Sequence, residues 1–172
     1  DGVDTIIRMA VKYGTSIGFS ASSLIIALLL VQFVAFPATL AYNYFSSRIG
    51  IKKAIYTAIF GYSIITIFGA LMSKEWHFYT LAVGIACFQG GIQALSRSMY
   101  ARIIPKEKAA EFYGFYNMLG KFAAIIGPPL MGYVGFVTGN PRISILSLII
   151  LFIAGAYFLS KVDLSEGERM AK

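Results

Sequence analysis

Long charge-free intervals divide this sequence. Asp, Glu, Lys and Arg are absent from 13–47, 54–73, 76–96, 122–141 and 143–160. Each interval has room for the roughly 20 apolar residues with which a helix crosses about 30 Å of hydrocarbon. The apolar runs 24–31 and 146–151 do not alternate between polar and apolar residues, as the strands of a membrane barrel would. The pattern therefore predicts an all-α membrane protein.

Six helical segments are predicted, forming one transmembrane bundle. Their expected bounds are 1–13, 22–47, 53–72, 77–104, 110–137 and 143–159. Pro105 ends the fourth segment, because proline cannot continue a helical hydrogen-bond ladder. The first segment is too short to span a membrane at about 1.5 Å per residue, so we expect a truncated first helix whose beginning is missing. The charged stretch 162–172 is expected to be a solvated cytoplasmic tail.

Composition supports a membrane protein and gives no sign of catalysis. Hydrophobic residues make up 58% of the chain and charged residues 13%, whereas soluble domains carry about 25% charged residues. A soluble fold of this size could not hide so much apolar surface. Phosphate loops, zinc-ligand spacings and nucleophile motifs of the usual kinds are absent from the sequence. We therefore expect no enzyme, no catalytic residue, no cofactor and no metal.

Basic residues indicate how the bundle is oriented. Those that follow the second, fourth and sixth segments are Arg48, Lys52, Lys53, Arg102, Lys106, Lys108, Lys161, Arg169 and Lys172. The opposite side has Lys74 and Arg142, with Lys12 near an edge. The positive-inside rule places the first group, and with it the C-terminus, in the cytoplasm. Topology thus accounts for most of the net charge of +7, and a nucleic-acid partner is not expected.

Four polar side chains are expected near the middle of the membrane. Asp4, Gln32, Gln89 and Lys121 each lie about 15–16 Å from the nearest predicted edge of their segment. Secondary transporters commonly bind substrate at this depth. The third and sixth segments offer only Ser, Thr and Tyr there, which predicts four cavity-facing helices and two outer ones.

Helical spacing adds further polar residues to these positions. Asp1, Asp4 and Arg8 share one face of the first segment. Gln89, Gln93 and Arg97 recur every four residues, and Asn117 lies one turn before Lys121. Two structural alternatives stay open: Asp4 and Arg8 neutralise each other, and the glutamines hold neighbouring helices together. Arg97 could also extend its guanidinium to the membrane edge.

The loop between the second and third segments resembles a known signature. Arg48, Gly50, Lys52 and Lys53 match the basic and glycine positions of the loop signature of the major facilitator superfamily, G-x-x-x-D-R-x-G-x-R-R. Asn43 and Ser47 stand where that signature has its first Gly and its Asp, so a charge latch that uses the Asp is in doubt for this chain.

Three further stretches resemble the vacuole-effluxer branch of that superfamily, which comprises autophagy-linked amino-acid effluxers and their bacterial relatives. They are 1–8, 89–98 and 112–122. The resemblance covers essentially the whole chain and implies the C-terminal six of twelve helices. It also implies a missing N-terminal six-helix half, a cavity shared with that half and alternating access. From the bacterial relatives we expect a multi-pass protein of the bacterial inner membrane.

The leading functional hypothesis is half of a secondary transporter for a small polar metabolite, such as an amino acid. Lys121 or Arg8 would attract a carboxylate, and Gln89 and Gln93 would hydrogen-bond the substrate. Asp4, Gln32 and Asn117 complete the predicted substrate-binding set. Asp4 is the first candidate for proton coupling and Asp1 the second, although the neighbouring Arg8 makes the direction of any pKa shift uncertain.

Two other classes stay open. One is a non-transporting scaffold or sensor that keeps the fold, and the other is a lipid or amphiphile exporter with a cavity open to membrane lipid. A chain that lacks its partner half could also pair with a second copy of itself.

Overall fold

The computed structural model describes residues 2–171, and within them all side chains except those at 2, 4, 7, 8, 10, 75, 123 and 124. Helices joined by short connections make up the described chain. Its elements are α1 (Gly2–Ser16), α2 (Ala21–Ile49), α3 (Ile51–Leu71), α4 (Glu75–Ile103), a short 3₁₀ turn η1 (Lys106–Lys108), α5 (Ala109–Thr138), α6 (Pro141–Leu146), α7 (Leu148–Lys161) and α8 (Leu164–Met170).

Five segments of the described chain are long and apolar enough to cross a membrane. They are Ala21–Ile49, Ile51–Leu71, Trp76–Ile103, Lys106–Thr138 and Pro141–Lys161. The last segment joins α6 and α7, which meet at Ser147, where the hydroxyl donates to the Ser144 carbonyl at 2.6 Å. These spans confirm the predicted all-α membrane bundle and establish an integral, multi-pass membrane protein.

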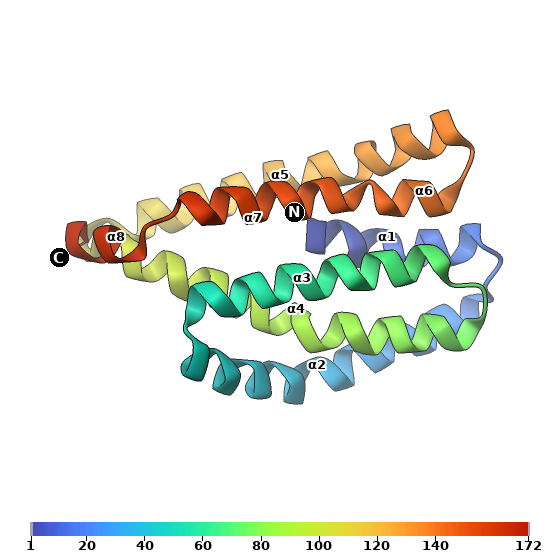
Figure 1. Cartoon of the computed structure of the whole chain (residues 1–172), viewed down its shortest axis with the longest axis horizontal. Coiled ribbons are helices and arrows are strands. Elements are labelled where there is room, and N and C mark those ends of the chain that lie inside the picture. Colours follow the sequence, from blue (N-terminus) through green and yellow to red (C-terminus); the bar gives the residue numbers. More distant parts are fainter. Residues whose placement is uncertain (1, 172) are drawn as a thin grey trace.

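The long helices run side by side along one axis (Figure 1). α3 and α7 lie in front in this view, whereas α2 and α5 form the two lateral edges. α4 packs against both α2 and α3, while α5 packs against α6 and α1. α1 lies between the edges in the half of the bundle away from α8. Its Tyr13 hydroxyl donates to the Gly69 carbonyl at 2.9 Å and ties it to α3.

Aromatic packing fills the centre of the bundle. Tyr62 of α3 is fully buried and stacks on Phe152 of α7 with ring centroids 5.8 Å apart. α2 and α4 approach closely at Gly90 and Gly91, where an added Cβ would overlap side chains of α2. Small residues at such crossings let helix backbones approach, which is how helices associate in lipid.

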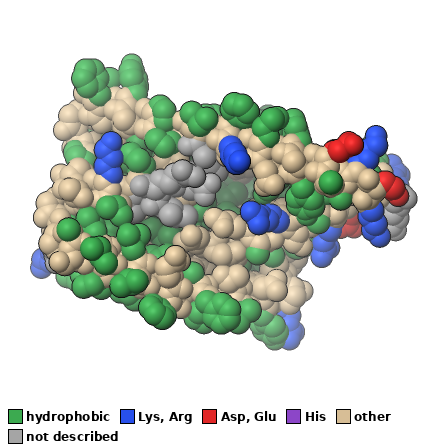
Figure 2. Space-filling view, turned by 180° about the vertical axis from the view of Figure 1, so that it is seen from behind, with side chains coloured by type: hydrophobic (Ala, Val, Ile, Leu, Met, Phe, Trp, Pro, Cys, Tyr) green, Lys and Arg blue, Asp and Glu red, His purple; other side chains and the backbone are tan. Residues whose placement is uncertain are grey.

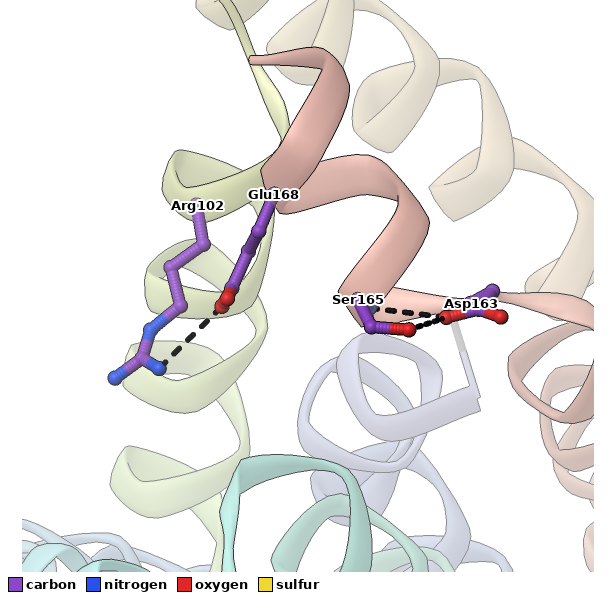
Figure 3. Close-up of polar contacts among 4 residues, drawn as sticks. All are labelled: Arg102, Asp163, Ser165 and Glu168. Atoms are coloured by element: carbon purple, nitrogen blue, oxygen red, sulfur yellow. Dashed lines mark hydrogen bonds and ion pairs between the residues drawn. The ribbon is translucent and has the colours of Figure 1, made fainter. Parts of the chain in front are cut away.

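The tail forms a helix that the sequence did not predict. Asp163 Oδ1 accepts hydrogen bonds from the Ser165 amide at 2.9 Å and the Glu166 amide at 3.2 Å, which caps α8. Hydrogen bonds from the Ser165 hydroxyl and these two amides lower the pKa of Asp163. Glu168 then pairs with Arg102 of α4 at 3.6 Å (Figure 3). α8 is therefore a short capped helix docked on the end of α4.

Candidate functional site

The described polar candidates of α4 lie on one helical face. Gln89, Gln93 and Tyr100 are spaced i, i+4 and i+11, and Arg97 stands at i+8 beside them. At about 100° per residue these positions stay within one side of the helix. Gln93 and Arg97 are exposed, whereas Gln89 is half-buried. The sequence prediction of a shared face therefore extends by one residue, Tyr100.

α5 carries a matching polar face. Tyr113, Asn117 and Lys121 are spaced i, i+4 and i+8, and Tyr116 flanks them. Asn117 and Lys121 are both exposed. A Cβ–Cα bond in a helix tilts toward the helix N-terminus, so the Lys121 side chain leaves α5 in the direction of Asn117.

Tyrosine contacts bring these two faces together. Tyr100 lies 4.7 Å from Tyr116 and 5.8 Å from Tyr113, measured between ring centroids. Its hydroxyl also donates to the carbonyl of Phe112 at 3.0 Å. We call Tyr100, Tyr113 and Tyr116 the tyrosine cluster. It joins α4 and α5 near the end that carries α8.

The polar residues rise from the tyrosine cluster toward the middle of the bundle. Counted at about 1.5 Å per residue from the level of Tyr100 and Tyr116, Lys121 stands roughly 8 Å higher, Gln93 roughly 11 Å and Gln89 roughly 17 Å. Figure 2 shows the side of the molecule that lies at the back of Figure 1, with basic side chains and a hollow in its middle, away from the charged end. The two helices therefore offer amide and cationic groups at successive depths.

We call Gln89, Gln93, Asn117 and Lys121 the polar stretch. Within it, Gln89 carries the most informative atom. Its side-chain oxygen Oε1 is buried and accepts no hydrogen bond from any residue that the structure describes. Leaving a buried acceptor unpaired costs about 1–3 kcal/mol. Such groups are rare in folded proteins and need an explanation, for example a bound ligand or water.

Gln32 lies apart from this stretch. It is exposed on α2, two turns before Thr39 on the same face, and Thr39 lies against Gly90 of α4. This places Gln32 about 10 Å further from the α8 end than Gly90. Asp1 and the side chains of Asp4 and Arg8 are outside the described residues, so their predicted roles stay predictions.

In the loop between α2 and α3, a lysine binds backbone carbonyls at the end of α7, which is a different contact from the charge latch of the superfamily signature. Gly50 turns the chain with φ of 89°, a conformation that favours glycine. Lys52 Nζ donates to the carbonyls of Val162 at 2.6 Å and Ser160 at 3.4 Å. A cation at these carbonyls satisfies the unpaired C-terminal end of α7. Arg48 turns back to the Tyr44 hydroxyl at 2.7 Å, and Lys53 is exposed.

Some of these contacts could not be found from the sequence. Tyr113 and Tyr42 have the positions of membrane-interface residues, but Tyr113 joins the tyrosine cluster, and Tyr42 is buried with its hydroxyl donating to Ala54 at 2.6 Å. Lys52 and Val162 are 110 residues apart. Of these contacts, only the tyrosine cluster had a local signal in the sequence, namely the spacing of Tyr113 and Tyr116 on α5. Within the described part of the chain, no three His, Cys, Asp or Glu side chains gather into a metal site.

Long apolar helices in a bundle, two of which carry amide and cationic groups on one face, define a polytopic membrane protein. The family model described as "Vacuole effluxer Atg22 like" matches residues 1–172. The chain belongs to this family, within the major facilitator branch that the sequence resembled.

Individual relatives agree with this assignment. The uncharacterized MFS-type transporter YxiO of Bacillus subtilis (strain 168) is 43% identical over 162 residues, which cover 94% of this chain and 38% of that protein. Autophagy-related protein 22 of Cryptococcus neoformans var. neoformans serotype D (strain JEC21) is 27% identical over 189 aligned residues, covering 99% of this chain and 33% of that protein. The chain thus spans only between a third and two fifths of the length of these relatives. No solved structure matches it significantly.

Proposed function

We propose that this chain is the C-terminal half of a secondary transporter that moves a small polar metabolite by alternating access, with an amino acid as the leading candidate. The buried Oε1 of Gln89, for which the described side chains and backbone supply no hydrogen-bond donor, carries this proposal. A substrate ammonium, hydroxyl or amide that donates to Oε1 would remove the cost of leaving it unpaired. The position of Gln89, in the middle of α4 and above Gln93, supports a site at membrane mid-depth.

Lys121 supports a carboxylate-bearing substrate. A lysine in the hydrocarbon costs several kcal/mol unless it faces a cavity or a partner. On α5 it shares a face with Asn117, just as Gln93 and Arg97 share a face of α4. A carboxylate bound between these groups would neutralise the cation and accept hydrogen bonds from the amides. Asp4 and Asp1 are the proposed proton-coupling residues, and Arg8 and Gln32 the proposed outer members of the site.

The two lateral helices support docking of another six-helix half. In the apolar segment of α2 only 11% of the residues are buried, and in that of α5 only 12% are. The corresponding share is 39% for both α3 and α4. Phe33 of α2 and Phe136 of α5 are 79% and 88% exposed. Because the chain covers 38% of the Bacillus relative, that relative has sequence enough for such a half. A second copy of this chain is the alternative partner.

The distribution of basic residues supports a proposed orientation in the membrane. Described basic residues at the end with α8 are Arg48, Lys52, Lys53, Arg102, Lys106, Lys108, Lys161 and Arg169, against Lys12, Lys74 and Arg142 at the other end. We place the α8 end in the cytoplasm and the protein in a bacterial inner membrane.

Two substitutions test the proposal in the full-length protein, reconstituted in liposomes and assayed for amino-acid counterflow. Gln89→Leu removes the unpaired acceptor, so we expect transport to fall at least tenfold while the protein stays as stable as the parent, or becomes more stable. Lys121→Ala should lower transport similarly, whereas Lys106→Ala in η1 should leave it unchanged.

Opposite results would refute the proposal. If Gln89→Leu destabilises the protein and leaves transport intact, Gln89 holds helices together and does not bind substrate. If neither substitution changes counterflow, the polar stretch is not a substrate path.

A further inference from the structure

A cavity lies in the other half of the bundle, away from the polar residues of α4 and α5. It has a volume of about 310 Å³ and opens between α1, α5 and α6. Lys12 and Met9 line it from α1, Met131 and Gly132 from α5, and Pro141 from α6. This volume is at the lower end of the range for small-molecule pockets, about 300–1,000 Å³.

The lining changes from polar to apolar with depth. Lys12 and Pro141 lie close to the helix ends, at the level where a membrane meets water. Met131 lies seven residues before the end of α5, about 10 Å deeper. Met9 lies one turn inside Lys12 on the same face of α1. A charged rim above an apolar interior fits an amphiphile, with its head at the rim and a chain inside.

Gly132 leaves room where no helix packs against it. A Cβ added there would meet no atom within 4 Å, whereas one added at Gly91 would overlap the Tyr42 ring. Glycine inside a helix costs about 0.5–1 kcal/mol relative to alanine. At Gly91 close helix packing explains that cost. At Gly132, as at Gly114 and Gly120 of the same helix, no packing contact explains it, and the open space at Gly132 belongs to the cavity.

The rim is cationic. Lys12 lines the cavity, and Arg142 directly follows Pro141, another of its lining residues. The acidic residues with described side chains all lie at the α8 end; they are Glu107, Glu111, Asp163, Glu166 and Glu168. Glu75, whose side chain is outside the described set, begins α4 next to Lys74.

From this geometry we propose that the cavity binds one anionic phospholipid. Its phosphate lies between Lys12 and Arg142, and one acyl chain extends along Met9, Met131 and Gly132. The site takes lipid from the leaflet opposite the α8 end. It is separate from the proposed substrate path and does not depend on transport.

Native mass spectrometry of the full-length protein tests the site. Phosphatidylglycerol and phosphatidylcholine with the same acyl chains serve as probes, and the measured quantity is the affinity ratio of the anionic over the zwitterionic lipid. Each basic residue near an anionic headgroup contributes about 1 kcal/mol, which is roughly fivefold in affinity. The double variant Lys12→Gln and Arg142→Gln should therefore lower the ratio about 25-fold, and Lys74→Gln, at the same end, should leave it unchanged.

A second variant tests the apolar part. Gly132→Leu has space for its side chain, so the protein should fold, elute as one species and bind both lipids at least tenfold more weakly. The proposal is overturned if the double variant keeps its preference for phosphatidylglycerol, or if Gly132→Leu binds both lipids like the parent. It is also overturned if Gly132→Leu does not fold. In that case the leucine side chain clashes with a protein segment, which means that the space is not free for a lipid.

Discussion

Removing the Tyr100 ring should loosen the contact between α4 and α5 by an amount that the structure lets us estimate. The Tyr100 hydroxyl bond to Phe112 contributes about 0.5–1.5 kcal/mol. Each of its two aromatic contacts, with Tyr113 and Tyr116, contributes about 0.5–1.5 kcal/mol beyond buried area. Tyr100→Phe should therefore cost about 1 kcal/mol and Tyr100→Leu about 2–4 kcal/mol of unfolding free energy.

The assay is reversible unfolding of the full-length protein in detergent, followed by a double-mutant cycle. Tyr133, which is 69% exposed on α5, provides controls of the same residue type, and Tyr133→Phe and Tyr133→Leu should each change stability by less than about 0.5 kcal/mol. Combining Tyr100→Leu with Tyr116→Leu should reveal a coupling energy of about 1 kcal/mol, as expected for residues in contact. A coupling of zero, or equal costs for Tyr100→Leu and Tyr133→Leu, would show that the tyrosine cluster does not hold the two polar faces together.

Three further predictions concern packing and the α8 end. Gly91→Leu should destabilise the protein by about 1–3 kcal/mol in the same unfolding assay, because its side chain would overlap an α2 ring; Gly114→Ala, which meets no atom, should be neutral or stabilising. Lys52→Met should cost about 1 kcal/mol and speed proteolysis after α7, and Lys53→Met should not. Because the pKa of Asp163 is lowered from 3.8, its capping contribution is complete above that value and is lost as pH falls through the lower, folded pKa. Hydrogen exchange in α8 should accelerate over that range, and Asp163→Asn should remove most of this pH dependence. If exchange in α8 of the parent protein shows no such pH dependence, Asp163 does not cap the helix.

Local pattern predicted most of the fold. Charge-free intervals located the spanning helices because about 20 apolar residues in a row have no other stable placement than lipid. The α8 helix was not predicted, because a single Asp163 cap and the docking of Glu168 on Arg102 decide it. The break at Ser147 was also missed, because a serine in an apolar segment gives no distinctive signal.

The candidate site was only partly accessible from sequence. Helical spacing placed Gln89 with Gln93, and Asn117 with Lys121, since period alone fixes a shared face. Which face of α4 meets which face of α5 depends on the ring contacts of Tyr100, and these are tertiary. Likewise, no local rule could show that the Gln89 oxygen is buried without a described partner.

Solvent access along the α4–α5 polar stretch is the most direct test of the central claim. In a full-length protein with Cys87→Ser, single cysteines at positions 93 and 121 would be treated with a membrane-impermeant thiol reagent. Phe60→Cys and Ile153→Cys, at positions 68% and 65% exposed on α3 and α7, are the outer controls. We predict rapid labelling at 93 and 121, slowed by transported substrate, and little labelling at 60 and 153. Protection of 93 and 121 to the level of the outer controls would contradict a water-filled substrate path between α4 and α5.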